Sequence, residues 1–278
     1  MKKDEVKKVV RKGYARIAKN EASCCLPADS SPEASDMATD ISKKIGYTEE
    51  ELKTVPQDAN LGLGCGNPVA LASLSEGETV LDLGSGGGLD CFLAASKVGS
   101  RGKVIGVDMT PEMIEKAREN ARKNKYENVE FRLGEIENLP AADKSVDAVI
   151  SNCVINLSPD KRRVFAEAFR VLKPGGRMII ADLVLLKELP EIIKNTIEAY
   201  IGCLSGAMMR DKYLEAIREA GFQEVKVIEE TQFPLECMTN DPTAKAVADN
   251  LKIPEEEINE IARSVISIKV FGRKPKTA

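Results

Sequence analysis

Apolar residues follow two alternating patterns through the middle of the chain. Short runs rich in Val, Ile and Leu, typical of buried strands, occupy residues 79–84, 103–109, 129–135, 146–152 and 177–183. Between them, apolar residues recur at helical spacing over 89–99, 110–124 and 159–172. Strands that alternate with helices predict an α/β fold with a mostly parallel sheet and right-handed crossovers.

The pattern is less regular on either side of this core. Before it, we expect an amphipathic helix over 4–19, a polar loop over 21–36 and a glycine-rich turn over 60–68. After it, the spacing predicts further helices and strands, at about 190–201, 210–220, 224–231, 254–265 and 266–275. The late strands are expected to add antiparallel pairs at one edge of the sheet.

These patterns suggest three parts. Residues 1–74 form an N-terminal helix with cysteine-bearing loops, 75–185 a ligand-binding core, and 186–278 a substrate lobe that also completes the sheet. We expect the C-terminal part to cover the top of the sheet.

Composition excludes some classes of partner. Hydrophobic residues make up 43% of the chain and charged residues 30%, as in ordinary globular proteins, and the net charge is −4. This acidic balance argues against a nucleic-acid partner. No apolar run is long enough to cross a bilayer, and the N-terminal residues lack the apolar stretch of a signal peptide. We therefore expect a cytosolic protein with no membrane partner.

The chain has seven cysteines and no histidine. Structural disulfides are rare in the cytosol, so thiols are available for metal, redox or catalytic chemistry. Without histidine, a metal or metalloid site must use cysteine or carboxylate ligands. Proton transfer must likewise depend on Asp, Glu, Lys, Tyr or Cys.

A glycine-rich loop follows the first expected strand, where ligands bind in open α/β sheets. Gly84, Gly86 and Gly88 let the backbone turn tightly and approach a ligand, although a plain tight turn would also use them. Asp108 ends the next strand, where a carboxylate can accept hydrogen bonds from both ribose hydroxyls. A dinucleotide fingerprint needs a sixth-position glycine, and Leu89 stands there instead.

The alternative to a dinucleotide is S-adenosylmethionine, which has no phosphate. It needs an acidic residue at the loop entrance, here Asp82, and the ribose carboxylate Asp108. Residues 75–185 resemble the class I methyltransferases in this order of elements. This resemblance implies a Rossmann-like α/β fold with a mostly parallel sheet of the seven-stranded type. The residues expected to contact the cofactor are Asp82, Gly84, Ser85, Gly86, Gly88, Asp108, Met109, Gly134, Glu135, Ile136 and Asn152.

Several cysteines stand where such a fold would place a substrate. Cys153 follows the fourth strand directly, at the position that borders the transferred methyl group, and Cys203 follows the helix after the fifth strand. Taken alone, each of these two cysteines would more often be core packing than a ligand. Cys65 lies between two glycines, and Cys24 with Cys25 lies on a polar loop, so packing explains these three poorly.

The remaining two cysteines have less to suggest chemistry. Cys91 lies on the apolar face of the first core helix, where core packing explains it, and Cys237 is unassigned.

Thiolates around a methyl donor suit a soft metalloid. Arsenic(III) prefers sulfur ligands in a three-coordinate pyramid, which leaves its lone pair available for methylation without a general base. Methylation by a formal methyl cation raises arsenic to the pentavalent state. Two thiols that close to a disulfide supply the two electrons needed to reverse this.

The motifs "SNCVINLSPDKRRVFAEAFRVLKPGG", "GCLSGA", "LGLGCGNP" and "SCC" closely resemble those of the arsenite methyltransferases. This resemblance implies that Cys153 and Cys203 bind As(III) and that Cys65 joins them during turnover. It also implies that Cys24 or Cys25 pairs with Cys65, and the sequence leaves this choice open. Members of the family use S-adenosylmethionine and are reset by a thioredoxin, glutaredoxin or glutathione reductant.

Two other functions fit parts of the sequence. A quinone- or sterol-type small-molecule methyltransferase would share the core but leave the cysteines unexplained. A thiol-based arsenite sensor would explain the cysteines but leave the methyl-donor site without a use.

Replacing Cys153 with serine separates the first alternative from arsenite methylation. The Cys153→Ser variant should lose arsenite methylation because a hydroxyl is a poor ligand for arsenic(III). The formation of methylarsenicals from S-adenosylmethionine and arsenite measures this. A variant that methylates arsenite at the wild-type rate would contradict the role of Cys153.

Overall fold

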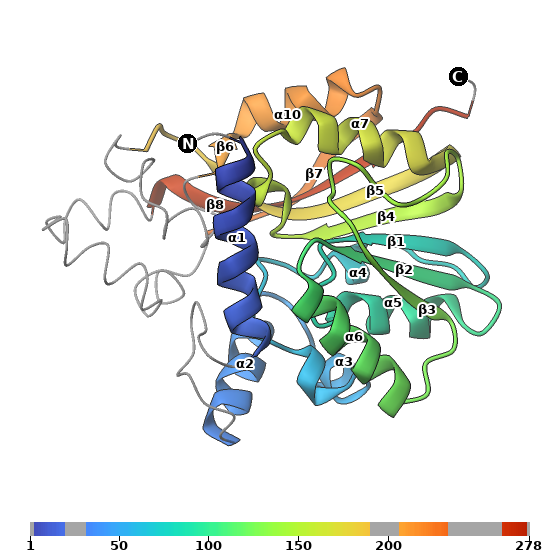
Figure 1. Ribbon diagram of the computed structural model, residues 1–278. Coiled ribbons are helices and arrows are strands. Elements are labelled where there is room, and N and C mark those ends of the chain that lie inside the picture. Colours follow the sequence, from blue (N-terminus) through green and yellow to red (C-terminus); the bar gives the residue numbers. More distant parts are fainter. Residues whose placement is uncertain (1–2, 20–31, 190–205, 233–262, 277–278) are drawn as a thin grey trace, which may run out of the picture.

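The computed structural model describes residues 3–19, 32–189, 206–232 and 263–276, with one sheet at the centre (Figure 1). The strand order is β3-β2-β1-β4-β5-β8-β7, and the short β6 pairs with the end of β5. The strands are β1 (Thr79–Leu83), β2 (Lys103–Asp108), β3 (Val129–Leu133), β4 (Val146–Asn152), β5 (Leu172–Leu185), β6 (Met208–Met209), β7 (Gln223–Gln232) and β8 (Val265–Arg273).

The sheet is parallel from β3 to β5 and antiparallel where β8 joins β5 and β7. Both features were predicted from the order of apolar runs. Because all the parallel strands point the same way, the loops after β1, β2 and β4 meet at the end of the sheet formed by the carboxyl ends of these strands.

Helices cover both faces of the sheet (Figure 1). On one face lie α7 (Lys161–Val171) and α10 (Arg210–Glu219), and on the other lie α5 (Leu89–Val98) and α6 (Pro111–Lys123). Helix α1 (Lys3–Ala18) runs across the end of the sheet where the loops meet. The shorter helices are α2 (Pro32–Lys44), α3 (Glu49–Lys53), α4 (Pro68–Leu71), η1 (Gln57–Ala59) and η2 (Ile155–Leu157).

Local sequence accounts for the main helix boundaries. Thr110 is the N-cap of α6 and Pro111 its first residue, a position where the missing proline N–H costs nothing. Helix α5 ends at Gly99, whose φ of +66° favours glycine. The inward face of α6 is formed by buried residues that include Met113, Ile114, Ala117 and Ala121.

Other boundaries differ from the prediction. The loop expected over 21–36 is wrong in its last part, because Pro32 begins α2 as a first helical residue. The strand expected over 129–135 ends at Leu133, and β5 begins at Leu172, ahead of the expected start at residue 177. The spacing of apolar residues before the first strand did not predict the short helices α3 and α4.

Helices expected over 190–201 and 254–265 fall mainly outside the described residues. At the end of the second range, Val265 already belongs to β8.

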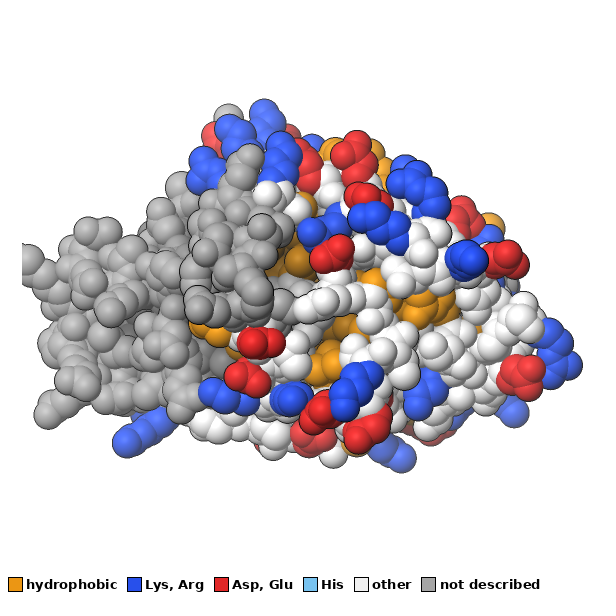
Figure 2. Space-filling view, turned by 90° about the horizontal axis from the view of Figure 1, so that it is seen from below, with side chains coloured by type: hydrophobic (Ala, Val, Ile, Leu, Met, Phe, Trp, Pro, Cys, Tyr) orange, Lys and Arg blue, Asp and Glu red, His pale blue; other side chains and the backbone are white. Residues whose placement is uncertain are grey.

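The surface carries both signs of charge. Figure 2 shows Lys and Arg side chains interspersed with Asp and Glu on the face seen from below, with hydrophobic side chains between them. The described residues on this face form no continuous basic surface of the kind that nucleic acids need. None of the helices in the described part is long and apolar enough to cross a bilayer.

Two aromatic rings lie beneath the glycine loop and belong to the core on the α5 and α6 side. Phe131 of β3 is 4% exposed, and its ring meets that of Phe92 edge to face at 5.8 Å between centroids. A side chain at Gly88 would come within 3 Å of both rings, so the loop and the aromatic pair are packed directly together.

Truncating Phe131 should therefore destabilise the fold. Phe131→Ala is expected to lower the free energy of unfolding by about 3–5 kcal/mol, because it leaves a cavity under the loop. Leu133, on the same strand, is 53% exposed, and Leu133→Ala should change it by less than about 0.5 kcal/mol. Urea unfolding of both variants measures the difference, and equal losses would contradict this account of the core.

Candidate functional site

The glycine loop lies where β1 ends and α5 begins. Gly84 has a φ of +73°, and a β-carbon there would lie 2.4 Å from a methyl carbon of Val154. The site therefore requires glycine for both conformation and space. The backbone N–H groups of Gly84 and Ser85 both donate to the carbonyl oxygen of Val107 in β2, which fixes the loop to its neighbouring strand.

Asp108, at the end of β2, is fastened to this loop. Its carboxylate accepts hydrogen bonds from the Gly86 N–H at 3.0 Å and from the Thr110 N–H at 2.8 Å. Burial raises the pKa of Asp108, and these backbone hydrogen bonds oppose that rise. The structure thus gives Asp108 a part in shaping the loop, which the sequence did not predict.

Two further polar groups lie buried at the loop. The Ser85 hydroxyl is buried and has no hydrogen-bond partner among the described residues, so it is available to a ligand. Asp82 is buried and accepts a hydrogen bond from the Cys91 thiol at 3.3 Å. Burial and the charge of Asp90 raise the pKa of Asp82. The prediction that Cys91 packs in the core is confirmed, because it is fully buried.

Helix α1 lies beside the residues that follow β3. Lys7 forms a salt bridge with Glu135 at 2.7 Å, and an Arg11 nitrogen lies 3.4 Å from the same carboxylate. Ile136 is buried in the core, and Met109 is half-buried and packs, like Tyr14 of α1, against the apolar cluster that contains Cys65. Met109, Glu135 and Ile136, which the sequence predicted to contact the cofactor, thus lie close to α1 or in the core beside it.

A second cluster brings cysteines together from distant parts of the chain. Cys65 precedes α4 and Cys153 follows β4. Their sulfur atoms and a carboxylate oxygen of Asp182 in β5 all lie within 4.8 Å of one another. The sequence predicted that Cys65 and Cys153 would meet, whereas Asp182 was missed. Its signal was a lone acidic residue inside the apolar strand "RMIIADL", since a buried charge in such a run is rare.

The backbone holds Cys153 in an uncommon conformation. Its φ is +57°, in the left-handed region that non-glycine residues rarely adopt. Its N–H donates to the carbonyl oxygen of Ala181 in β5 at 2.8 Å. Such a conformation is found at functional sites, where surrounding contacts maintain it. Here it turns the chain sharply out of β4 at the thiol.

Asn152 holds the loop that carries Cys65. Its side-chain oxygen accepts a hydrogen bond from the Cys65 N–H at 2.9 Å, and its nitrogen donates to the Gly66 carbonyl at 2.8 Å. A β-carbon on Gly64 would lie 2.7 Å from the same amide nitrogen, so glycine is needed there. Ser267 of β8 donates to the Cys65 carbonyl at 2.6 Å. The loop is thereby fastened to two strands.

The amide of Asn152 also reaches the helix that follows the glycine loop. Its nitrogen donates to the Tyr47 hydroxyl at 2.8 Å and to Asp90 of α5 at 3.2 Å, and Tyr47 donates to Asp90 at 2.7 Å. Burial raises the pKa of Asp90 to about 6. Tyr47 and Asp90 were not predicted as site residues. They connect the glycine loop to the cysteine loop.

Asp182 is fully buried and held by three donors. Tyr213 of α10 donates to one oxygen at 2.8 Å, and the Asn156 amide and the Leu183 N–H donate to the other, each at 2.9 Å. Burial outweighs these hydrogen bonds and raises the pKa of Asp182 to about 7.

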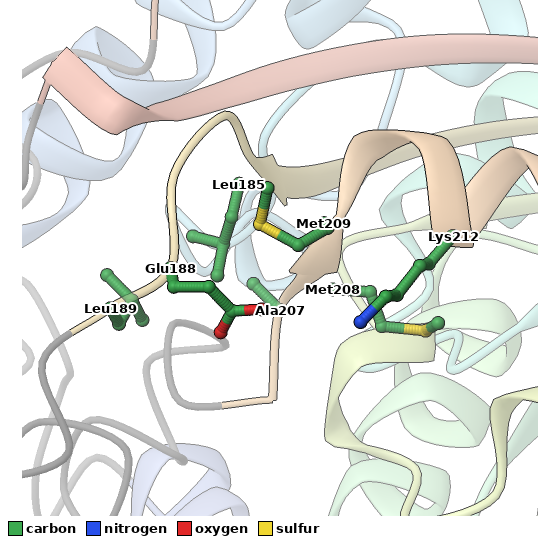
Figure 3. A pocket seen from close by; sticks show the side chains of 7 residues that line it. All are labelled: Leu185, Glu188, Leu189, Ala207, Met208, Met209 and Lys212. Atoms are coloured by element: carbon green, nitrogen blue, oxygen red, sulfur yellow. The ribbon is translucent and has the colours of Figure 1, made fainter.

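The other expected cysteines, Cys24, Cys25, Cys203 and Cys237, lie outside the described residues. Ala207 and Met209 follow Cys203 in the chain and pack in the same apolar cluster as Cys65 and Cys153. They also line a hollow of about 200 Å³ at the end of β5 (Figure 3). The lining residues are Leu185, Glu188, Leu189, Ala207, Met208, Met209 and Lys212.

Comparison with known proteins agrees with this geometry. A family described as "Methyltransferase domain" matches residues 74–221. An arsenic(III) S-adenosylmethionine methyltransferase from Chlamydomonas reinhardtii has a similar structure, with a TM-score of 0.61 and 31% identity. That match covers 89% of this chain and 75% of the other. The class I methyltransferase fold predicted from the sequence is thereby confirmed.

Two curated relatives are similar over most of this chain. The arsenite methyltransferase of Halobacterium salinarum is 48% identical over 239 residues, which are 83% of this chain and 61% of that protein. The arsenite methyltransferase of Homo sapiens is 34% identical over 228 residues, 78% of this chain and 58% of that protein. The chain thus spans about three fifths of the length of these relatives.

The raised pKa of Asp182 predicts a pH-dependent stability. Between its ordinary pKa of 3.8 and its folded value of about 7, the folded protein holds a proton that the unfolded chain has released. This group therefore lowers the free energy of unfolding as pH rises through that window. Asp182→Asn lacks this titrating group, so the variant does not lose stability in this way. The free energy of unfolding of the variant minus that of wild type should therefore increase by roughly a few kcal/mol from pH 4 to pH 7.

Urea unfolding at several pH values measures this difference. Asp211→Asn, which alters a 95% exposed side chain on α10, serves as the control for an exposed carboxyl. A constant difference between Asp182→Asn and wild type across the window would contradict the account.

Proposed function

This chain belongs to the arsenite methyltransferase family of S-adenosylmethionine-dependent enzymes, and we propose that it methylates trivalent arsenic held by cysteine thiolates. The observation that carries the proposal is the meeting of Cys65 and Cys153, from opposite sides of the glycine loop in sequence. The product would be a methylated arsenical, and the process a detoxification of arsenite.

The arrangement of the thiols suits this substrate. Arsenic(III) prefers sulfur ligands, and three thiolates leave its lone pair available for methylation. Cys65 and Cys153 offer two sulfur atoms within 4.8 Å of each other. The family resemblance supplies Cys203 as the third, and the packing of Ala207 and Met209 in the same cluster supports that assignment.

The residues around the glycine loop fit S-adenosylmethionine. The buried Ser85 hydroxyl lacks a partner in the described part of the chain, and the carboxylates of Asp82 and Asp108 flank the loop. We assign these side chains to cofactor binding, together with the backbone of the loop. The cofactor supplies a methyl group activated by its positively charged sulfur. The chain contributes positioning, since arsenic needs no general base.

Electrons for the cycle are proposed to come from cysteines. Methylation of As(III) gives formally pentavalent arsenic, and two electrons return it to the trivalent state. Cys65 and one of Cys24 or Cys25 would supply these two electrons, with loss of both thiol protons, by closing to a disulfide. A cytosolic thiol reductant, namely thioredoxin, glutaredoxin or two molecules of glutathione, would then reduce that disulfide.

The two rival functions each leave part of the site without a use. A quinone- or sterol-type methyltransferase does not need Cys65 held against Cys153 by Asn152. An arsenite sensor does not need the glycine loop with Asp108 and Ser85. Arsenite methylation uses both parts, and their connection through Asn152 and Asp90 favours it.

Separate sites for cofactor and arsenite lead to a test with Asp108→Ala. This variant should bind S-adenosylmethionine roughly tenfold to a hundredfold more weakly, because hydrogen bonds to a charged group are lost. Arsenite affinity should stay nearly unchanged. Calorimetric titration with each ligand measures both constants.

The matched control is Asp143→Ala, which removes a 72% exposed carboxylate far from the loop in sequence and should leave both affinities unaltered. An equal fall in arsenite affinity for Asp108→Ala would show that the two sites are not separate. Failure of the wild-type protein to methylate arsenite would overturn the proposed function itself.

A further inference from the structure

We infer that Cys65, Cys153 and Asp182 form a site for a thiophilic divalent cation of the zinc class, which competes with the trivalent substrate. The binding of the cation depends only on these three side chains. Its effect on methylation rests on the proposed function, because the cation would occupy two of the thiols proposed to hold arsenic.

The donor set matches zinc chemistry. Zinc binds cysteine sulfur at about 2.3 Å and carboxylate oxygen at about 2.0–2.2 Å, so donors on one ion lie at most about 4.6 Å apart. The two sulfur atoms and the Asp182 oxygen already lie within 4.8 Å of one another. Small side-chain rotations therefore suffice to bring three donors onto one ion. Each thiol would lose its proton to solvent as the cation binds.

When Asp182 is ionised, the protein supplies little positive charge to compensate its carboxylate. Its side chain is fully buried, and no lysine or arginine in the described part of the chain forms a salt bridge with it. Lys161 lies beyond salt-bridge distance, and its positive charge lowers the pKa of Asp182 only in part. An unpaired buried carboxylate is costly, and a bound cation offsets that cost.

The hydrogen bonds of Asp182 leave room for a ligand bond. One oxygen accepts from both Asn156 and Leu183, which uses its two lone pairs. Among the residues that the structure describes, the other oxygen accepts from Tyr213 alone, which leaves one lone pair for a ligand. Carboxylates that bind metals are commonly oriented by such neighbouring donors. Tyr213 and Asn156 would orient Asp182 in this way.

A second observation concerns the fourth position of the site. The Asn156 side-chain oxygen is buried and has no hydrogen-bond partner among the residues that the structure describes. The nitrogen of the same amide donates to Asp182. Zinc with three protein ligands keeps a water molecule as its fourth ligand. The Asn156 oxygen would accept a hydrogen bond from that water.

Asp182 distinguishes the two kinds of ligand. Arsenic(III) takes sulfur ligands, so its proposed site needs Cys203 as the third thiolate and makes no use of the carboxylate. The divalent cation needs the carboxylate and makes no use of Cys203. Two variants therefore separate the sites, namely Asp182→Asn and Cys203→Ser.

The test is a titration of the reduced full chain with cobalt(II), which stands in for zinc and absorbs light when bound to thiolates. Wild type should bind one equivalent with a sulfur-to-cobalt charge-transfer band, and zinc should displace it. Cys203→Ser should keep this affinity nearly unchanged. Asp182→Asn should weaken it by at least about tenfold, whereas Tyr213→Phe, which keeps the carboxylate, should weaken it less.

Three results would overturn the inference: no thiolate band in wild type, loss of cobalt binding in Cys203→Ser, or equal affinity in Asp182→Asn and wild type. The Cys203→Ser result decides alone if Asp182→Asn does not fold. Because the titration contains no S-adenosylmethionine and no arsenite, its outcome is independent of the methylation assay that tests the proposed function.

Discussion

The side-chain amide of Asn152 joins the parts of the site that the chain itself keeps far apart. Its oxygen accepts the Cys65 N–H, and its nitrogen reaches the Gly66 carbonyl, Tyr47 and Asp90. The next residue is Cys153, so one short stretch of β4 sets the position of both thiols. The loop that carries Cys65 has little regular structure of its own. The hydroxyl of Ser267 in β8 also fastens its cysteine to the sheet.

Several buried groups at the site lower the stability of the folded protein. Asp82, Asp90 and Asp182 are all buried carboxylates whose pKa values are raised by burial. Cys153 adds a left-handed backbone conformation that side chains disfavour. A fold selected only for stability would replace such groups with apolar ones. Their concentration at the carboxyl ends of β1, β4 and β5 marks this edge of the sheet as the functional one.

The alternation of strands and helices could be predicted because the spacing of apolar residues differs between the two. In each case the apolar side chains are the ones that pack against the neighbouring layer of the fold. The glycine loop and Cys153 were predictable because both stand at strand ends. The pairing of distant segments could not be predicted, because no local sequence pattern indicates it. Examples are the hydrogen bond that Asn152 accepts from the Cys65 N–H and the position of Asp182 beside two thiols. Such contacts depend on how the loop before α4 crosses the sheet. Tyr47 and Asp90 were missed for the same reason.

The central claim is that thiols of this chain both hold arsenic and supply electrons for its methylation. A single-turnover assay tests it most directly, with reduced protein, S-adenosylmethionine and arsenite but no added reductant. The account predicts about one methylarsenical, one S-adenosylhomocysteine and one new disulfide per chain. Methylation without disulfide formation would contradict the electron supply. Tight arsenite binding with no methylated product would contradict the claim as a whole.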